Sequence, residues 1–298
     1  MRRNLQLCLR VHGFMNKKSL SPGRFALMAG LPPYDFSSYL RGHCLADVAD
    51  IEKKISAVLS READKKNLPR SNPGFIETSI SKRIWESCKL CHLQNDIAVI
   101  FGDAGIGKSM ACREYVARHA DAVFVECLVG FSATYLFAKL CELLNLNENM
   151  GLRYSFEAVQ KQLRDSGRLI ILDEAEHVTY RGLDLLRRIH DFTGVGIVMV
   201  GLQKLLSNLR GKTGEYRQLF SRVGIAVRLD TINESDAENM VREWIPSAGD
   251  LWTEAWKRSN SNARRLSKIC KMSLHIADVN NCEVNKEVIK AASELLIS

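Results

Sequence analysis

Residues 102–109 read Gly-Asp-Ala-Gly-Ile-Gly-Lys-Ser, and this stretch decides the fold class. It satisfies the phosphate-loop pattern G-x-x-x-x-G-K-[ST] in the required context, after a short apolar run (98–101) and before an expected helix (108–119). Glycines let the backbone curl so that successive N–H groups point at phosphates, and the helix N-terminus adds a positive dipole. We therefore predict that Lys108 reaches the β- and γ-phosphates of ATP and that Ser109 ligates Mg²⁺.

An acidic motif farther along the chain supplies the second half of the expected ATP site. Residues 169–172 are Leu-Ile-Ile-Leu, an expected buried strand, and Asp173 and Glu174 follow it. Ligands of α/β sheets bind at the carboxyl ends of the strands. Asp173 is predicted to hold the hydrated Mg²⁺, and Glu174 to orient the attacking water for hydrolysis.

Two arginines are predicted to complete the site. Arg222 directly precedes the expected fifth strand, where it can reach a neighbouring subunit's active site and stabilise the transferring phosphoryl group. Arg264 opens a helix and is expected to fold over the nucleotide. The predicted catalytic residues are Glu174, Lys108 and Arg222, and the metal ligands are Ser109 and Asp173. The predicted nucleotide-binding residues are Gly102, Asp103, Ala104, Gly105, Ile106, Gly107, Lys108, Ser109, Met110, Asp173 and Arg264.

Short apolar runs alternate with helical segments through the middle of the chain. The expected strands are 98–101, 123–127, 169–172, 196–200 and 225–229, and the helices between them lie near 108–119, 132–144 and 155–165. This alternation predicts an α/β fold with a parallel sheet covered on both faces. From Asn233 onward the pattern is helical, with Trp244, Trp252 and Trp256 expected in a helical core.

The first quarter of the chain is basic. Residues 1–70 hold 13 Lys and Arg against 6 Asp and Glu, most of the net charge of +8. A helix ending at Ala29, a turn at Gly30 and a second helix over 33–40 form a helix-turn-helix pattern, and a third helix is expected over 45–59. Ala26 is expected at the close approach of the helices and Leu31 in the core between them. This module either binds DNA, with Arg24 and Arg41 as candidate contacts, or is a purely structural bundle.

The predicted domains are a basic helix-turn-helix domain (1–66), a linker (67–74), a P-loop core (75–230) and a helical lid (231–298). The composition, 46% apolar and 26% charged, is that of an ordinary globular protein, and no export signal or long apolar run stands out. We therefore expect a cytoplasmic protein. Cys88-Lys-Leu-Cys91-His92 matches the pattern of haem attachment or half a zinc site, but a helix carrying two buried thiols is the favoured interpretation.

With the ATP motifs, Arg222 and Arg264 in this order, the chain resembles the AAA+ family. The preceding basic module and Phe75-Ile-Glu-Thr78 make it similar to the MuB-like transposition target-selector ATPases, which include TnsC and TniB. This resemblance implies a homo-oligomeric filament or ring on double-stranded DNA that recruits and activates a transposase and dissociates on hydrolysis. It also implies that Arg222 acts across the subunit interface, that Phe75 to Thr78 lie near the adenine, and that Arg153, in a loop between two helices, contacts DNA.

The chain departs from the family pattern at two places. Leu202 stands where a polar residue, often Asn, follows the glycine after the fourth strand, so hydrolysis is expected to be slow unless Gln203 substitutes. Pro32-Pro33 stands where Ser or Thr would cap the second helix of the helix-turn-helix. A helicase loader and an ATP-switched regulator of a specific operator are alternative functions, and whether the basic domain contacts DNA or the transposase stays open.

Overall fold

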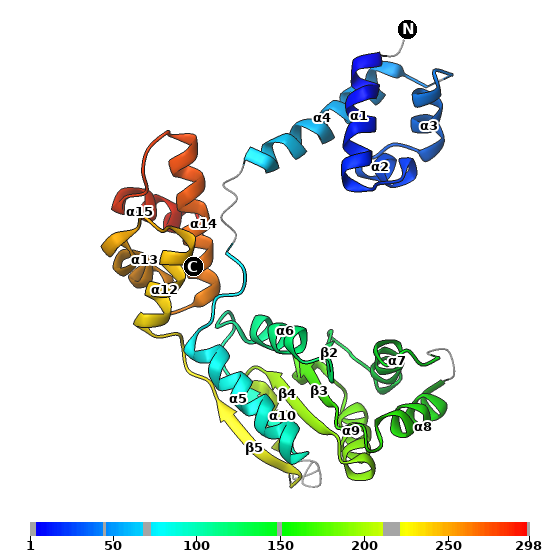
Figure 1. Ribbon diagram of the computed structural model, residues 1–298, viewed down its shortest axis with the longest axis vertical. Coiled ribbons are helices and arrows are strands. Elements are labelled where there is room, and N and C mark those ends of the chain that lie inside the picture. The colour runs from blue at the N-terminus through cyan, green and yellow to red at the C-terminus, as the bar shows by residue number, and fades with distance from the viewer. Residues whose placement is uncertain (1–3, 44–45, 68–72, 148–150, 211–220, 297–298) are drawn as a thin grey trace. The chain divides into compact units, whose positions relative to one another are not determined.

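The computed structural model describes residues 4–43, 46–67, 73–147, 151–210 and 221–296, and it divides into two compact units, residues 1–70 and 71–298. The larger unit contains a five-stranded sheet in the order β2-β3-β4-β1-β5, in which every neighbouring pair is parallel (Figure 1). The strands are β1 Ile97–Phe101, β2 Ala122–Glu126, β3 Leu169–Asp173, β4 Gly196–Gly201 and β5 Val223–Arg228. The predicted α/β class and all five predicted strands are confirmed.

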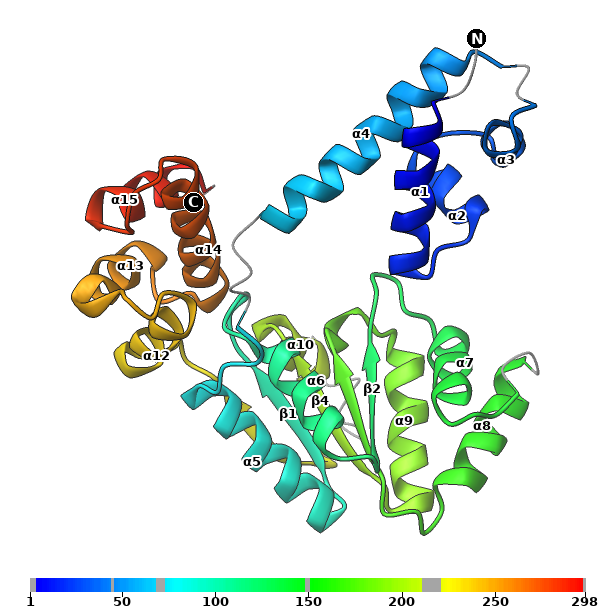
Figure 2. The ribbon, with the colours of Figure 1, turned by 45° about the horizontal axis from the view of Figure 1, so that its top comes forward.

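Helices cover both faces of this sheet (Figure 2). Because side chains alternate along a strand, Ala98 and Ile100 of β1 enter one buried cluster and Val99 enters the other. The first face is covered by α5 Ser79–Gln94 and α6 Lys108–Arg118, and the second by α7 Ala133–Leu143, α8 Gly151–Leu163, α9 Tyr180–Thr193 and α10 Gln203–Arg210. The sheet is therefore buried on both sides, as its apolar strands predict.

The cysteines of the C-x-x-C-H stretch are structural. Cys88 and Cys91 lie on α5 and are fully buried against the sheet. The Cys91 thiol donates to the carbonyl oxygen of Asp96 at 2.8 Å, and burial raises its pKa to about 12. Among the described residues no group of three or more His, Cys, Asp or Glu side chains is arranged to hold a metal. The predicted helix with two buried thiols is confirmed.

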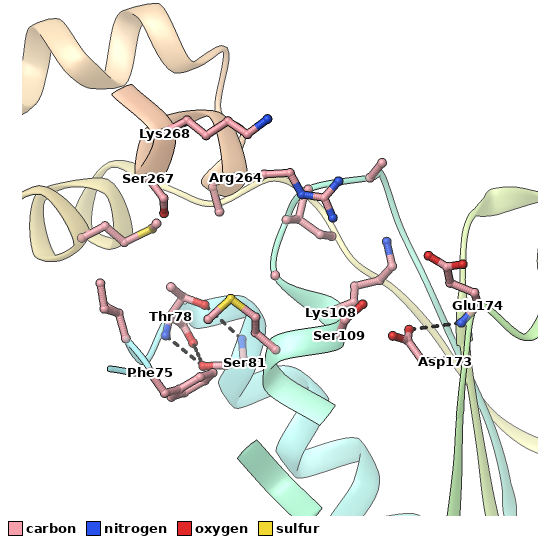
Figure 3. A pocket seen from close by; sticks show the side chains of 18 of the residues that line it. Phe75, Thr78, Ser81, Lys108, Ser109, Asp173, Glu174, Arg264, Ser267 and Lys268 are labelled. Carbon is pink, nitrogen blue, oxygen red and sulfur yellow. Dashed lines mark hydrogen bonds between the residues drawn. The ribbon is translucent and has the colours of Figure 1, made fainter. Parts of the chain in front are cut away.

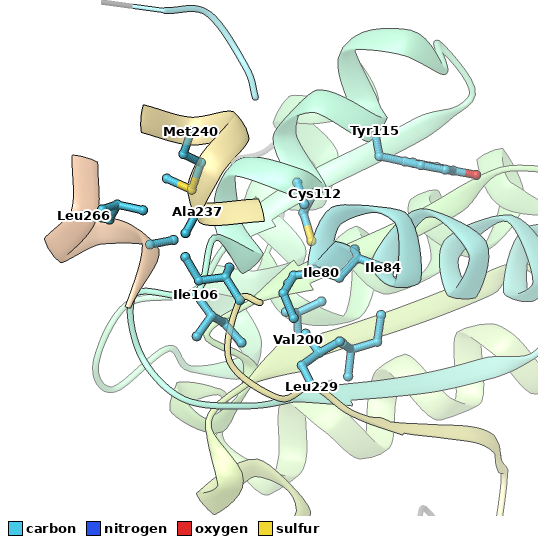
Figure 4. Close-up of a cluster of buried hydrophobic side chains, with 14 of the residues drawn as sticks. Ile80, Ile84, Ile106, Cys112, Tyr115, Val200, Leu229, Ala237, Met240 and Leu266 are labelled. Carbon is cyan, nitrogen blue, oxygen red and sulfur yellow. The ribbon is translucent and has the colours of Figure 1, made fainter. Parts of the chain in front are cut away.

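Four helices and one 3-10 turn follow the sheet, namely α12 Glu234–Trp244, the turn Gly249–Leu251, α13 Trp252–Ser259, α14 Ala263–Val279 and α15 Lys286–Glu294. They pack on one another and on the end of the first buried cluster, where Ala237 and Leu266 lie with Ile106 of the phosphate loop (Figure 4). Trp244 is buried and Trp252 and Trp256 are partly buried against this cluster, as expected. No described helix has the length and apolar character needed to cross a membrane.

The N-terminal unit is a helical bundle of α1 Leu5–Lys18, α2 Pro22–Met28, α3 Pro33–Arg41 and α4 Val48–Asn67. Gly30 takes a left-handed φ of 62°, and the Leu31 N–H donates to the Ala26 carbonyl at 2.9 Å, which closes the turn between α2 and α3. Ala26 and Leu31 are buried beside Phe25 and Phe36, whose rings stack 5.1 Å apart. The two predicted helices and the glycine turn between them form, and α3 begins at Pro33 without a side-chain cap.

Two predicted element boundaries are wrong. The third N-terminal helix starts at Val48 and runs to Asn67 rather than covering 45–59. The reason is an ion pair between Lys18 of α1 and the buried Glu62, which docks the polar end of α4 on α1. Arg153 lies in the first turn of α8 rather than in a loop, since this helix starts at Gly151 and is supported by an Arg153–Glu157 pair at 3.2 Å.

Candidate nucleotide site

The phosphate loop connects β1 to α6 and is shaped by two glycines. Gly105 and Gly107 have φ values of 82° and 102°, which side-chain-bearing residues rarely adopt, and Gly107 is the N-cap of α6. The loop therefore presents backbone N–H groups and the positive end of α6 to one side. Lys108 is only 9% exposed, and its Nζ donates to the carbonyl oxygens of Gly102 and Asp103 at 2.8 and 2.7 Å. Burial lowers the pKa of Lys108, while the nearby carboxylates of Asp173 and Glu176 oppose that shift.

A cavity of about 650 Å³ opens over this loop (Figure 3). Of the predicted nucleotide-binding residues, the following line it: Ala104, Gly105, Ile106, Gly107, Lys108, Ser109, Met110, Asp173 and Arg264. Gly102 and Asp103 do not line it. Gly102 lies so close to Leu229 that an added Cβ would come within 2.9 Å of the Leu229 Cβ, so its role is to let β1 and the chain after β5 approach.

The carboxyl end of β3 places two acidic residues opposite Lys108 and Ser109 (Figure 3). Asp173 is 1% exposed, and its Oδ1 accepts the Glu174 N–H at 3.1 Å. Within the described part of the chain, its buried Oδ2 has no hydrogen-bond partner. Burial raises the pKa of Asp173, although the nearby Ser109 hydroxyl and the Glu174 N–H oppose this shift. Glu174 has a left-handed φ of 53°, and its exposed side chain lines the cavity.

Glu176 is a pocket residue that the sequence analysis missed. It lies in the 3-10 turn Ala175–His177, and its Oε1 accepts the N–H of Leu202 at 3.1 Å. Gly201 makes this possible, because a Cβ there would collide with the Glu176 carboxylate. Leu202, the predicted departure from the family pattern, does line the cavity, and a carboxylate lies beside it. The sequence Asp-Glu-Ala-Glu could have indicated this residue, because its second glutamate follows the same strand end as Asp173 and Glu174.

The start of α14 docks directly on the phosphate loop, a contact that sequence reasoning also missed. Asn262, the N-cap of α14, accepts the Arg265 N–H and donates through Nδ2 to the Ala104 carbonyl at 2.8 Å. The Arg264 N–H donates to the Gly105 carbonyl at 2.8 Å. A Cβ on Gly105 would lie 2.5 Å from the Asn262 Oδ1, so the glycine is required for this contact. Arg264 itself points into the cavity (Figure 3).

The far end of the cavity is apolar and aromatic. Phe75, Ile76 and Thr78 line it from the segment before α5, and Met240 and Trp244 line it from α12. Phe75 stacks on Trp85 of α5 with ring centroids 5.4 Å apart. This shape suits a planar base, and the family resemblance implies that Phe75 to Thr78 lie near the adenine.

The remaining predicted site residues lie elsewhere. Arg222 directly precedes β5 and so lies at the amino-terminal end of the strands. Its Nε donates to Asp191 Oδ1 at 3.0 Å. The sequence before the strand reads Leu219-Phe220-Ser221-Arg222, and its first two residues lie outside the described residues. Arg24 is exposed on α2, Arg41 is exposed as the last residue of α3, and Arg153 is exposed on α8.

Comparison with known proteins agrees with this geometry. A protein-family model described as an AAA domain matches residues 92–209. The Mu-like prophage FluMu DNA transposition protein B of Haemophilus influenzae is 25% identical over 77% of this chain and 82% of its own length. The ATP-dependent target DNA activator B of Escherichia phage Mu is 28% identical over 74% of this chain and 72% of its own length.

A solved structure shares the fold. The ORC2 protein of Aeropyrum pernix superimposes with a TM-score of 0.58 at 16% identity, covering 74% of this chain and 67% of that one. The AAA domain match and the transposition relatives cover the P-loop core just described. The chain thus carries an AAA domain over residues 92–209 and is similar in sequence to MuB-type transposition proteins over about three quarters of its length.

Proposed function

We propose that this protein binds ATP with Mg²⁺, assembles on duplex DNA with little sequence preference, recruits and activates a transposase there, and dissociates when ATP is hydrolysed. Two relatives are named for DNA transposition and for ATP-dependent activation of target DNA. The observation that carries the proposal is the cavity in which the phosphate loop, the acidic end of β3 and the start of α14 meet. By these relatives, the protein would act in the cytoplasm of a bacterial host.

The proposed roles follow from the chemistry of each group. The N–H groups of residues 104–110 bind the phosphates, and Lys108 exchanges its bonds to the Gly102 and Asp103 carbonyls for phosphate oxygens. Glu174 orients and deprotonates the attacking water, for which its exposed carboxylate at the strand edge is suited. Leu202 cannot bond that water, so intrinsic hydrolysis is slow. Arg264 contacts the nucleotide from α14 and so links the lid to its state.

Asp173 and Ser109 fit a magnesium ion. The Asp173 Oδ2 is buried without a hydrogen-bond partner among the described residues, and an unsatisfied carboxylate oxygen of this kind is expected where a cation completes the site. Carboxylate and hydroxyl oxygens are ligands that Mg²⁺ accepts together with phosphate oxygens and water. When bound, the ion supplies positive charge that polarises the phosphoryl oxygens.

Arg222 is proposed to act on a neighbouring subunit. Val223 pairs with Ile97 at the start of β1, whereas the phosphate loop follows the end of that strand. The six residues of β5 at about 3.3 Å each separate Arg222 from its own phosphate loop by roughly 20 Å along the sheet. An arginine side chain does not bridge that separation, so any contact between Arg222 and a γ-phosphate needs a second chain.

We assign the parts of the chain accordingly. Residues 1–66 form a basic domain that contacts DNA through Arg24 and Arg41, 67–74 connect it, 75–230 form the ATPase core, and 231–298 form the lid. Arg153, exposed on α8, contributes a phosphate contact from the core. Contacts of this kind go to the DNA backbone and carry no base specificity, which agrees with little sequence preference.

The test is the ATPase rate against protein concentration, with and without random-sequence duplex DNA, paired with electron microscopy of the same samples. The expected result is cooperative, DNA-stimulated turnover with filaments or rings on the duplex. If the ATPase rate did not depend on DNA or on protein concentration, and no assemblies formed, the protein would still be an ATPase. The proposed function as a target activator would then be wrong. A footprint confined to one sequence would favour an operator-specific regulator instead.

A further inference from the structure

The carboxyl-terminal half of α9 carries a network of charged side chains. Arg187 is largely buried and reaches in two directions. Its Nε and Nη2 bond Asp184 Oδ1 at 3.1 and 2.8 Å, and its Nη1 bonds Asp191 Oδ2 at 2.5 Å. Asp191 is thus held by a guanidinium that is itself fixed one helical turn away, and its orientation is defined by the core of the subunit.

The second oxygen of Asp191 is used by Arg222. The Arg222 Nε donates to Asp191 Oδ1 at 3.0 Å, while the Arg222 side chain stays 55% exposed. Bonding through Nε leaves the two Nη groups at the free end of the guanidinium, where no described residue accepts a hydrogen bond from them. These are the N–H groups that a guanidinium presents to a phosphate. The ion pair therefore presents Arg222 rather than burying it.

We propose that Asp191 is a positioning residue, which holds Arg222 by its Nε so that both Nη groups are directed at the nucleotide of a neighbouring subunit. This inference rests on the proposed role of Arg222 in trans. Arg222 precedes β5, so the hydrogen-bond ladder of the sheet does not fix its backbone, and its half-exposed side chain is oriented by the Asp191 bond. A free arginine side chain samples many rotamers, and anchoring it beforehand removes part of the entropy lost when it engages the phosphoryl group.

The test compares Asp191→Asn with the matched variant Asp184→Asn. Both remove one carboxylate of the α9 network, but Asp184 bonds Arg187 and Arg188 and does not contact Arg222. In the full chain assembled on DNA, Asp191→Asn is expected to lower kcat at least tenfold with an unchanged KM for ATP, because misplacing a catalytic group by about 1 Å can cost up to a hundredfold. Asp184→Asn loosens Arg187 but leaves the Asp191 carboxylate that accepts the Arg222 Nε, so its kcat is expected to fall by no more than about threefold. Equal loss in both variants, or a faster Asp191→Asn protein, would overturn the proposal.

Mixing experiments separate this role from a folding defect. Glu174→Gln subunits keep the Asp191–Arg222 pair and lose the water-orienting carboxylate, whereas Asp191→Asn subunits keep an intact nucleotide pocket. Mixed one to one, the two should hydrolyse ATP faster than the sum of the separate proteins, whereas Asp191→Asn mixed with Arg222→Ala should not. No recovery in the first mixture would overturn the proposal. If Arg222→Ala alone left turnover unchanged, the trans role of Arg222 would fail; a slow Arg222→Ala with a normal Asp191→Asn would sink only the positioning role.

Discussion

The docking of α14 on the phosphate loop predicts a measurable coupling through Asn262. Asn262→Ala removes the N-cap of α14, at a cost of about 1 kcal/mol. It also removes the Nδ2 bond to the Ala104 carbonyl, whose net worth is again about 1 kcal/mol. We therefore expect the unfolding free energy to fall by about 2 kcal/mol. Since the second contact orders the loop that binds phosphates, the nucleotide Kd should rise about fivefold.

Asn285 provides a matched control. It caps α15 by accepting the Val288 N–H at 2.9 Å, as Asn262 caps α14, but it lies outside the nucleotide cavity. Asn285→Ala should cost about 1 kcal/mol of unfolding free energy and leave nucleotide affinity unchanged. Asn262→Asp keeps the capping oxygen and loses the amide donor, so it should weaken nucleotide binding with a smaller loss of stability.

The assay is urea unfolding followed by the fluorescence of the lid tryptophans, with nucleotide affinity measured calorimetrically on the same preparations. The variants share one fold, so differences in unfolding midpoint report differences in stability when the slopes agree. If Asn262→Ala were no less stable than Asn285→Ala and bound nucleotide as the parent does, the contact would not couple the lid to the loop.

Four further predictions concern the site and the DNA. Lys108→Ala should abolish nucleotide-dependent DNA binding in a filter or gel assay, while Glu174→Gln should trap the ATP-bound protein on DNA with turnover reduced at least a hundredfold; rapid turnover of the latter would remove Glu174 from its role. Because burial raises the pKa of Asp173 in the fold, the stability associated with its neutral form is full below the unfolded-state pKa and is lost as the pH rises through the folded-state pKa. Asp173→Asn should accordingly stabilise the nucleotide-free protein at neutral pH and remove magnesium-dependent nucleotide binding, as thermal unfolding with and without Mg·ATP would measure. Arg41→Glu should weaken DNA binding and flatten its salt dependence, and an unchanged salt slope would assign the basic domain to a protein partner.

The sheet and the phosphate loop could be predicted from sequence because their signals are local. A run such as Leu-Ile-Ile-Leu before Asp173 is a buried parallel strand whatever surrounds it, and a phosphate loop between strand and helix carries its own geometry. The N-terminal boundaries failed because α4 continues through polar sequence, held by Glu62 against Lys18, which are 44 residues apart. Arg153 was misplaced because its helix starts one turn earlier, at a glycine.

The missed site residues share a different cause. Asn262 meets Ala104 across 158 residues of sequence, and Asp191 meets Arg222 across 31, so no periodicity or motif links either pair. One part of this arrangement could be predicted from the sequence. Asn262 stands at a position typical of a helix N-cap, but an N-cap that also donates to a distant carbonyl can be recognised only once the fold brings the two segments together.

Arg222 lies at the end of the sheet where the strands begin, and the nucleotide pocket lies at the end where the strands finish. This separation has a consequence for regulation. Because all strands are parallel, residues that directly precede a strand lie at one end of the sheet, and residues that directly follow a strand lie at the opposite end. If Arg222 acts in trans, an isolated chain lacks the charge that stabilises its own phosphoryl transfer, and only assembly on DNA supplies it. The slow intrinsic hydrolysis proposed from Leu202 would act in the same direction, so a dilute protein would keep its ATP until neighbours dock. Lys108 and the neighbour's arginine would both bind the γ-phosphate. Hydrolysis would remove this shared contact and so weaken the interface between subunits. In the proposed function this is the step at which the protein releases DNA.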